Sequence, residues 1–167
     1  MKLPTSFTRM LQVAAFALLV PAAVAFAAQT PDSASISKLF QQAKVHAAQA
    51  NEDISFLDSN RYSGLSAQSH AMYLQMVKEH AANLFRTYYQ LQALREKATP
   101  QQREAIDRLD PLLRDMATSL TNTLQNLNAN PTLVHMPPFR NRIHSDYQAI
   151  TAVYEQLCKC ANKNSKI

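Results

Sequence analysis

The sequence predicts an all-α protein: an up-down-up-down four-helix bundle that follows a cleaved N-terminal signal peptide. First, the 167 residues contain a single glycine, whereas sheets joined by tight hairpins need glycine in their turns and helix interiors exclude it. Second, apolar residues recur at three- and four-residue steps in four long segments, which is the spacing of one helix face. Third, the first three segments are joined by short links, which place consecutive helices antiparallel and side by side.

Residues 1–27 have the order of features that is typical of a secretory signal peptide. Two basic residues, Lys2 and Arg9, precede an uncharged apolar run at 11–20. Small residues then supply a cleavage site after Ala27, and a cut two residues earlier is the alternative. A membrane-spanning helix needs ~20 apolar residues and this run is about half that length. We therefore expect cleavage, and a periplasmic or secreted mature protein without stable membrane insertion.

The charge of the mature chain is mild. Two of the 17 basic residues and none of the 12 acidic residues lie in the signal peptide, so cleavage lowers the net charge from +5 to +3. The basic residues are scattered along the chain, whereas a nucleic-acid-binding surface needs a concentrated basic patch. We expect no nucleic-acid partner, one bundle domain at 28–161, and a flexible basic tail at 162–167.

The first two helices are predicted from their apolar spacing. The first runs from about Ser33 to Asp58, and its apolar stripe is rich in alanine. Residues 60–64 end it, and the sole glycine in this turn suits a left-handed conformation. The second runs from about Ser66, a plausible N-cap, to Lys97. Its predicted seam consists of Tyr73, Val77, His80, Leu84, Tyr88, Leu91 and Leu94.

The third helix begins with the clearest local signal in the chain. Thr99 is followed by proline and then by Gln102 at the third helical position, which is a capping box. Its apolar residues continue at heptad spacing to about Asn128. Pro111 lies inside this pattern, and it either kinks the helix or restarts it with Asp110 as a cap.

The fourth helix follows a proline-rich connection. Three prolines interrupt residues 128–138, so no regular helix is expected there. A helix then begins near Pro138 and carries aromatic and β-branched residues at helical spacing.

The sequence lacks the motifs that several kinds of enzyme and cofactor-binding protein need. A single glycine is too few for a phosphate-binding loop, a dinucleotide fingerprint or a nucleophile elbow. No glutamate is followed three residues later by histidine, as di-iron bundles require, and no Cys-x-x-Cys-His motif for covalent haem is present. We therefore expect a non-enzymatic protein with no cofactor.

One helical face nevertheless carries candidate metal ligands. Met72, Met76 and His80 recur at four-residue steps in the second helix, so they share a face. Thioether and imidazole groups suit copper, and His46 of the first helix would be a further ligand. The competing interpretation is that both methionines fill the core and that His80 lies on the packed seam.

The two cysteines, Cys158 and Cys160, are separated by one residue near the end of the fourth helix. Residues with that spacing point to nearly opposite sides of a helix, so a direct bond would require local unwinding. Three interpretations stay open: a strained local disulfide beyond a frayed helix end, an intermolecular disulfide, or separate fates for the two thiols.

The capping segment also carries a family resemblance. Residues 98–103, Ala-Thr-Pro-Gln-Gln-Arg, are similar to the Leu-Thr-x-x-Gln motif of the Spy/CpxP-like periplasmic chaperones. Alanine stands in place of the motif's leucine, and no second copy of the motif follows. The resemblance implies a cradle-shaped dimer that shields unfolded client proteins.

Two functional hypotheses follow. The first is an exported interaction protein of the cell envelope, with chaperone-like action, whose partner is an envelope protein or a second copy of the chain. The second is a carrier that holds copper or haem in the bundle, with Met72, Met76, His80 and His46 as candidate ligands.

Overall fold

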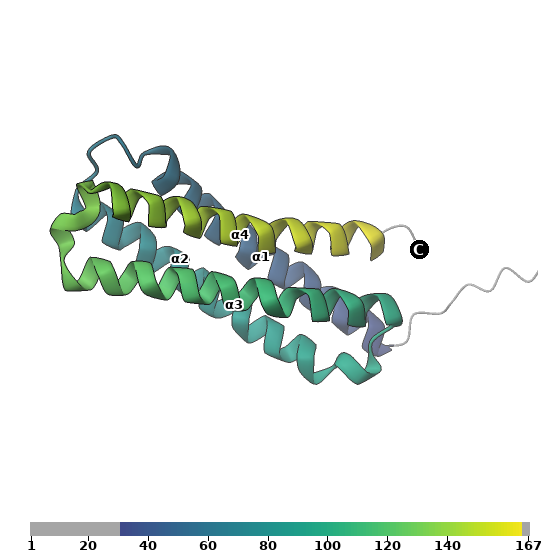
Figure 1. Ribbon diagram of the computed structural model, residues 1–167. Coiled ribbons are helices and arrows are strands. Elements are labelled where there is room, and N and C mark those ends of the chain that lie inside the picture. Colours follow the sequence, from purple (N-terminus) through teal and green to yellow (C-terminus); the bar gives the residue numbers. More distant parts are fainter. Residues whose placement is uncertain (1–30, 165–167) are drawn as a thin grey trace, which may run out of the picture.

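The computed structural model describes the backbone of residues 31–164 and the side chains of residues 32–160. Four helices, and no strand, make up this part of the chain (Figure 1). The predicted signal peptide and the last three residues of the predicted tail lie outside the described residues. The helices are α1 (Pro31–Ser59), α2 (Ala67–Ala93), α3 (Pro100–Ala129) and α4 (Pro137–Asn164), with short 3-10 turns η1 (Arg95–Lys97) and η2 (Pro131–His135).

The four helices form an antiparallel bundle with one loosely packed seam. The direction of the chain alternates from α1 to α4, so that the α1–α2 and α3–α4 turns share one end of the bundle (Figure 1). Helix α1 packs extensively along α2 and α4, and α4 packs along α3, whereas α2 and α3 meet much less. None of the described helices is long and apolar enough to cross a membrane.

All four helices contribute apolar stripes to the core, and those of α1, α3 and α4 follow the predicted spacing. The stripe of α1 includes three buried alanines, Ala43, Ala47 and Ala50, and small residues allow neighbouring helices to approach closely. The α3 positions predicted at heptad spacing are all buried. The largest fully buried side chains are Phe40, Ile36, Ile54, Leu57, Leu74, Leu84, Leu91, Ile106, Leu109, Leu113, Met116 and Ile143.

The predicted turn and cap signals are confirmed. Gly64 has φ of 75°, and the Ser66 hydroxyl accepts a hydrogen bond from the Ser69 N–H at 3.1 Å. At α3 the Thr99 hydroxyl accepts from the Gln102 N–H at 3.3 Å, and the Gln102 side chain accepts from the Thr99 N–H at 3.0 Å. The buried Gln102 amide also donates to the Ser33 carbonyl at 3.2 Å, which ties α3 to the start of α1.

The predictions for α2 need correction in its end and in its buried face. The helix ends at Ala93, and residues 95–97 tighten into η1 before Ala98 and Thr99 become extended ahead of Pro100, as residues before proline prefer. The buried face of α2 centres on Leu74, Val77 and Ala81. Three members of the predicted seam lie at the edge of this face and are only partly buried, namely Tyr73, His80 and Leu94.

Helix α3 runs unbroken through Pro111, so the predicted restart with Asp110 as a cap is wrong. Pro111 and Asp107 both lie on the exposed face. Water can therefore reach the Asp107 carbonyl that loses its helical partner to the proline ring, which lowers the cost of the missing bond.

Candidate functional site

The two candidate methionine ligands lie at the surface of α2. Met72 is 54% exposed and Met76 is 38% exposed, so the interpretation of these residues as core filler is wrong. The reason is the rotation of α2: with Leu74 and Val77 facing the core, residues 72 and 76 point outward.

The two candidate histidines face the α1–α2 interface. His80 Nε2 lies 3.5 Å from Asp53 Oδ2 of α1. Burial raises the pKa of Asp53, and the nearby His80 opposes that rise. His46 lies two turns before Asp53 on α1, about 10 Å away along the helix axis, and its buried Nδ1 has no hydrogen-bond partner among the described residues. Within the described residues, no three His, Cys, Asp or Glu side chains gather closely enough to hold a metal ion.

The cysteines lie near the opposite end of the bundle, in an unbroken part of α4. Cys158 is half-buried, Cys160 is buried, and no disulfide joins them. The Tyr154 hydroxyl is hydrogen-bonded to Cys158, and this contact raises the pKa of Tyr154. The Gln156 amide lies 3.7 Å from Cys160 Sγ. Cys160 borders a small cleft of about 150 Å³ between α3 and α4.

Exposed apolar side chains gather at the end where α1 turns into α2 and α3 turns into α4. Seven large apolar side chains are exposed in the described chain, and two of them, Val45 and Tyr89, lie elsewhere. The five at this end are Phe56, Tyr62, Met72, Met76 and Met136. The Phe56 ring stacks on the partly buried Tyr73 at 4.2 Å between centroids. We name the surface formed by Phe56, Met72, Tyr73 and Met76 the apolar flank.

Two arginines lie close to the ring of an exposed tyrosine in the turn between α1 and α2. The guanidinium carbons of Arg61 and Arg140 each lie 5.1 Å from the centroid of the exposed Tyr62 ring, within the range of a cation–π interaction. Arg61 and Tyr62 come from the α1–α2 turn, whereas Arg140 comes from the first turn of α4. We name these three residues the arginine–tyrosine stack.

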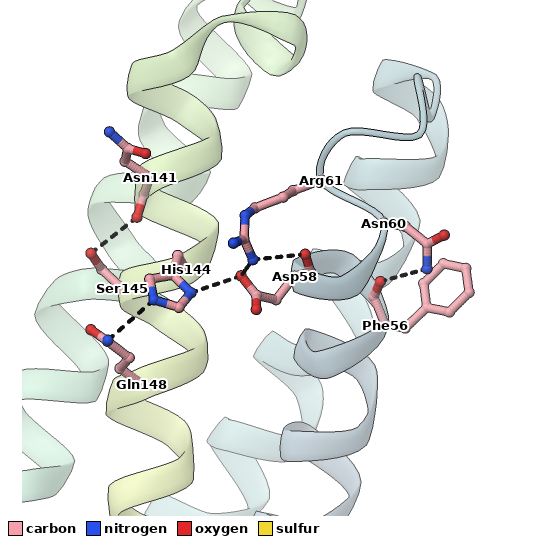
Figure 2. Close-up of polar contacts among 8 residues, drawn as sticks. All are labelled: Phe56, Asp58, Asn60, Arg61, Asn141, His144, Ser145 and Gln148. Atoms are coloured by element: carbon pink, nitrogen blue, oxygen red, sulfur yellow. Dashed lines mark hydrogen bonds and ion pairs between the residues drawn. The ribbon is translucent and has the colours of Figure 1, made fainter.

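A polar network holds the stack in place (Figure 2). The Arg61 guanidinium donates to the Asp58 carboxylate at 2.5 Å and to the Asp58 carbonyl at 3.0 Å. The same carboxylate lies 3.0 Å from His144 Nδ1 of α4, and the Gln148 amide lies 3.2 Å from His144 Nε2. Hydrogen bonds to Tyr62 and Asp58 raise the pKa of Arg61. The turn is thereby fixed to both α1 and α4.

This network does not assemble a nucleophile. The Ser145 hydroxyl donates to the Asn141 carbonyl at 3.1 Å (Figure 2), so it is turned away from the Asp58–His144 pair. Asp146 is 1% exposed and its carboxylate accepts from Ser119 of α3 at 2.5 Å. The consecutive residues His144, Ser145 and Asp146 therefore have three separate environments.

The distribution of charge distinguishes this end from the rest of the chain. Residues 59–78 and 116–145 contain no aspartate or glutamate, although they contain arginine and lysine. Two acidic residues adjoin these segments at this end, and neither is free: Asp58 is bonded to Arg61 and His144, and Asp146 is buried. Within the described residues, Arg140 is therefore left without an acidic partner, whereas Arg61 is paired with Asp58. Sequence reasoning missed the stack, and the two acid-free segments are the signal that could have found it.

Comparison with known proteins assigns the chain to no family. No family model matches the chain, and no curated protein or solved structure gives a significant match.

Proposed function

We propose that the chain is an exported, non-enzymatic helical-bundle protein of the cell envelope that acts by protein interaction, in a chaperone-like manner, through the apolar flank. Residues 1–27 would direct export, and the described helices would form the working domain. The single observation that carries the proposal is the exposure of Met72 and Met76 beside the stacked Phe56 and Tyr73.

The side chains of the flank suit contact with apolar segments of other proteins. Methionine is flexible and polarizable, so it adapts to varied surfaces, and aromatic residues and methionine are enriched in the buried parts of protein interfaces. Exposed apolar residues that gather together mark interaction sites more often than single ones do.

A carrier of copper or haem has less support. His80 is turned toward Asp53 of α1 and not toward solvent beside the methionines, and the described residues give it no neighbouring group of ligands. Titration of the purified protein with Cu(I) against a competing chelator, and with haem by visible spectroscopy, tests this alternative. A stoichiometric complex that is lost in Met72→Leu/Met76→Leu would favour the carrier over the interaction protein.

The interaction proposal is tested with the full chain expressed in a bacterial host. Mass spectrometry of the protein recovered from the periplasm reads out export and the cut after Ala27. The recovered protein is then mixed with a chemically unfolded client protein, and client aggregation is followed by light scattering. We expect suppression of aggregation by the wild type and its loss in the double variant Met72→Gln/Met76→Gln.

Val45 provides the matched control, because it is as exposed as Met72, at 54%, but lies outside the flank. We expect Val45→Gln to behave as the wild type. Equal suppression by all three proteins would show that the flank is not the binding surface, and no suppression by the wild type would overturn the chaperone-like action.

A further inference from the structure

We propose that the arginine–tyrosine stack binds carboxylate side chains, so that the partner of this protein is an acidic polypeptide segment whose apolar side chains cover the apolar flank. This inference rests on the proposed function and specifies the chemistry of its partner.

Arg140 has donors that the described chain does not use. It forms no ion pair with any described residue. Its Nε is buried and has no hydrogen-bond partner among the described residues, so the terminal nitrogens of the guanidinium are the donors that another molecule would meet. Its guanidinium instead lies against the Tyr62 ring. Because a guanidinium presents parallel N–H donors that match the two oxygens of a carboxylate, Arg140 is suited to an acidic side chain from another molecule.

Arg61 and Tyr62 are already fixed before a partner arrives. The Asp58 carboxylate holds Arg61 and is itself bonded to His144 of α4 (Figure 2). Groups that are ordered in the free protein lose less conformational entropy when they bind. Asp58 is therefore a positioning residue, which orders Arg61 before a partner binds.

The surroundings favour an acidic partner over a neutral or basic one. The acid-free segments 59–78 and 116–145 contribute positive charge at this end of the bundle, and the nearby Asp58 carboxylate is already occupied. Complementary charge across an interface raises the association rate and discriminates against partners of like charge.

The arrangement of stack and flank favours an extended polypeptide over a membrane surface. Arg61 lies between Phe56 of α1 and His144 of α4 in Figure 2, so the turn connects an apolar residue of the flank with the polar network. Met76 is nine residues into α2, about 14 Å along the helix axis. If α2 stood perpendicular to a bilayer that touches the turn, Met76 would lie beyond the ~5–10 Å to which side chains enter the interface. A chain segment, in contrast, can pass over the turn and along α2.

The test measures peptide affinity by fluorescence anisotropy with the full-length protein. Three labelled peptides of equal length share the same leucines and differ in their polar positions, which are glutamate, glutamine or lysine. We expect the glutamate peptide to bind best and to lose affinity as salt rises, because salt screens exposed charges. Arg140→Gln should weaken its binding about threefold to tenfold, and Arg61→Gln/Arg140→Gln should weaken it further.

Arg86→Gln is the matched control, because Arg86 is an exposed arginine of α2 whose guanidinium donates to Asn83. It removes the same charge away from the stack, and we expect less than a twofold change. Equal binding of the glutamate and glutamine peptides, with loss in Met72→Gln/Met76→Gln, would overturn the acidic partner but keep the interaction function. Failure of all three peptides to bind would overturn the inference. Cosedimentation with phosphatidylglycerol vesicles that depends on Arg140, together with failure of the glutamate peptide, would assign the site to a membrane instead.

Discussion

The two ends of the bundle both carry arginines, but they use them differently. At the α2–α3 end, Arg95 donates to both oxygens of Asp107 at 2.8 and 2.9 Å. Halfway along α3, Arg114 donates to Asp110 at 2.8 Å. At the α1–α2 end, Arg140 lies against an aromatic ring and forms no ion pair within the described chain. The first arrangement satisfies charge within the fold, and the second leaves donors for another molecule.

The polar side chains that join different helices also differ between the two ends of the bundle. Near the α2–α3 end, Gln102 joins the capping box of α3 to the Ser33 carbonyl of α1. At the α1–α2 end, the polar contacts of Arg61 and His144 converge on the carboxylate of Asp58, whose side chain is 13% exposed. The comparison teaches that substitutions at the α2–α3 end should lower stability, whereas substitutions in the stack should alter binding and leave stability nearly intact.

The largest effect is expected for Gln102→Ala. This change removes the amide that donates to Ser33 and accepts from Thr99. Because each lost hydrogen bond contributes ~0.5–1.5 kcal/mol net, the free energy of unfolding should fall by about 1–3 kcal/mol in urea denaturation. Gln101→Ala, at an exposed neighbouring position, is the control and should be neutral. A loss below about 1 kcal/mol for Gln102→Ala would break the comparison.

A smaller effect, with a defined pH dependence, is expected for Asp146. Burial raises its pKa, while hydrogen bonds from Ser119 and Thr123 and the charge of Arg142 oppose the rise. A carboxyl with a raised folded-state pKa stabilises the fold below its unfolded-state pKa and loses that contribution as pH rises through the folded-state value. Relative to Asp146→Asn, the wild type should therefore lose stability as pH rises from the unfolded-state pKa through the raised folded-state pKa of Asp146.

For Asp110 we expect the opposite dependence of stability on pH. Hydrogen bonds from Tyr88 and Arg114 lower its pKa, so its contribution is present above the unfolded-state pKa and is lost as pH falls. Urea denaturation of the wild type, Asp146→Asn and Asp110→Asn across the pH range checks both signs. Parallel pH profiles for the three proteins would contradict the assignment.

Gly64→Ala should cost about 1–2 kcal/mol, because a residue with a Cβ is strained in the left-handed conformation. Gly64 has φ of 75°, and an added Cβ would meet no atom within 4 Å, so the cost comes from the backbone alone. Asparagine tolerates this conformation better, so thermal unfolding should rank Gly64→Asn between the wild type and Gly64→Ala. Equal stability of the three proteins would show that the turn adopts another conformation.

The caps at the two ends should differ by a modest amount. Thr99 forms a reciprocal capping box, whereas the Ser66 hydroxyl accepts from one backbone N–H. We expect Thr99→Ala to cost about 1–2 kcal/mol and Ser66→Ala about 0.5–1 kcal/mol. Chemical denaturation of the two variants measures the difference, and a reversed order would mean that the α1–α2 end contributes more to stability than its contacts indicate.

The smallest effect on stability is expected for the stack itself. Arg140→Gln should change the free energy of unfolding by less than about 1 kcal/mol, since exposed cation–π contacts contribute ~0.5–1 kcal/mol. Thermal unfolding checks this expectation. A loss above about 2 kcal/mol would identify Arg140 as a structural residue and would remove the contrast between the two ends.

Local signals predicted most of the fold correctly. The capping box at Thr99, the left-handed turn at Gly64 and the stripes of α1 and α3 depend on residues close in sequence. Four members of the predicted α2 seam are buried: Val77, Leu84, Tyr88 and Leu91. The start of the seam was predicted one position away from the buried Leu74, because Tyr73 and Leu74 both extend plausible apolar patterns. The position of α1 selects Leu74 for the core and leaves Tyr73 to stack on Phe56.

The sequence by itself determined that this chain is helical, where three of its four helices begin, and which chemistries lack their motifs, because glycine content, helix caps and periodicity act over a few residues. Only the tertiary structure decided the candidate site. The stack joins residues 61 and 62 to residue 140, and the network that holds it joins Asp58 to His144. Contacts between residues so far apart arise only when α1 and α4 pack side by side, so no local pattern carries them.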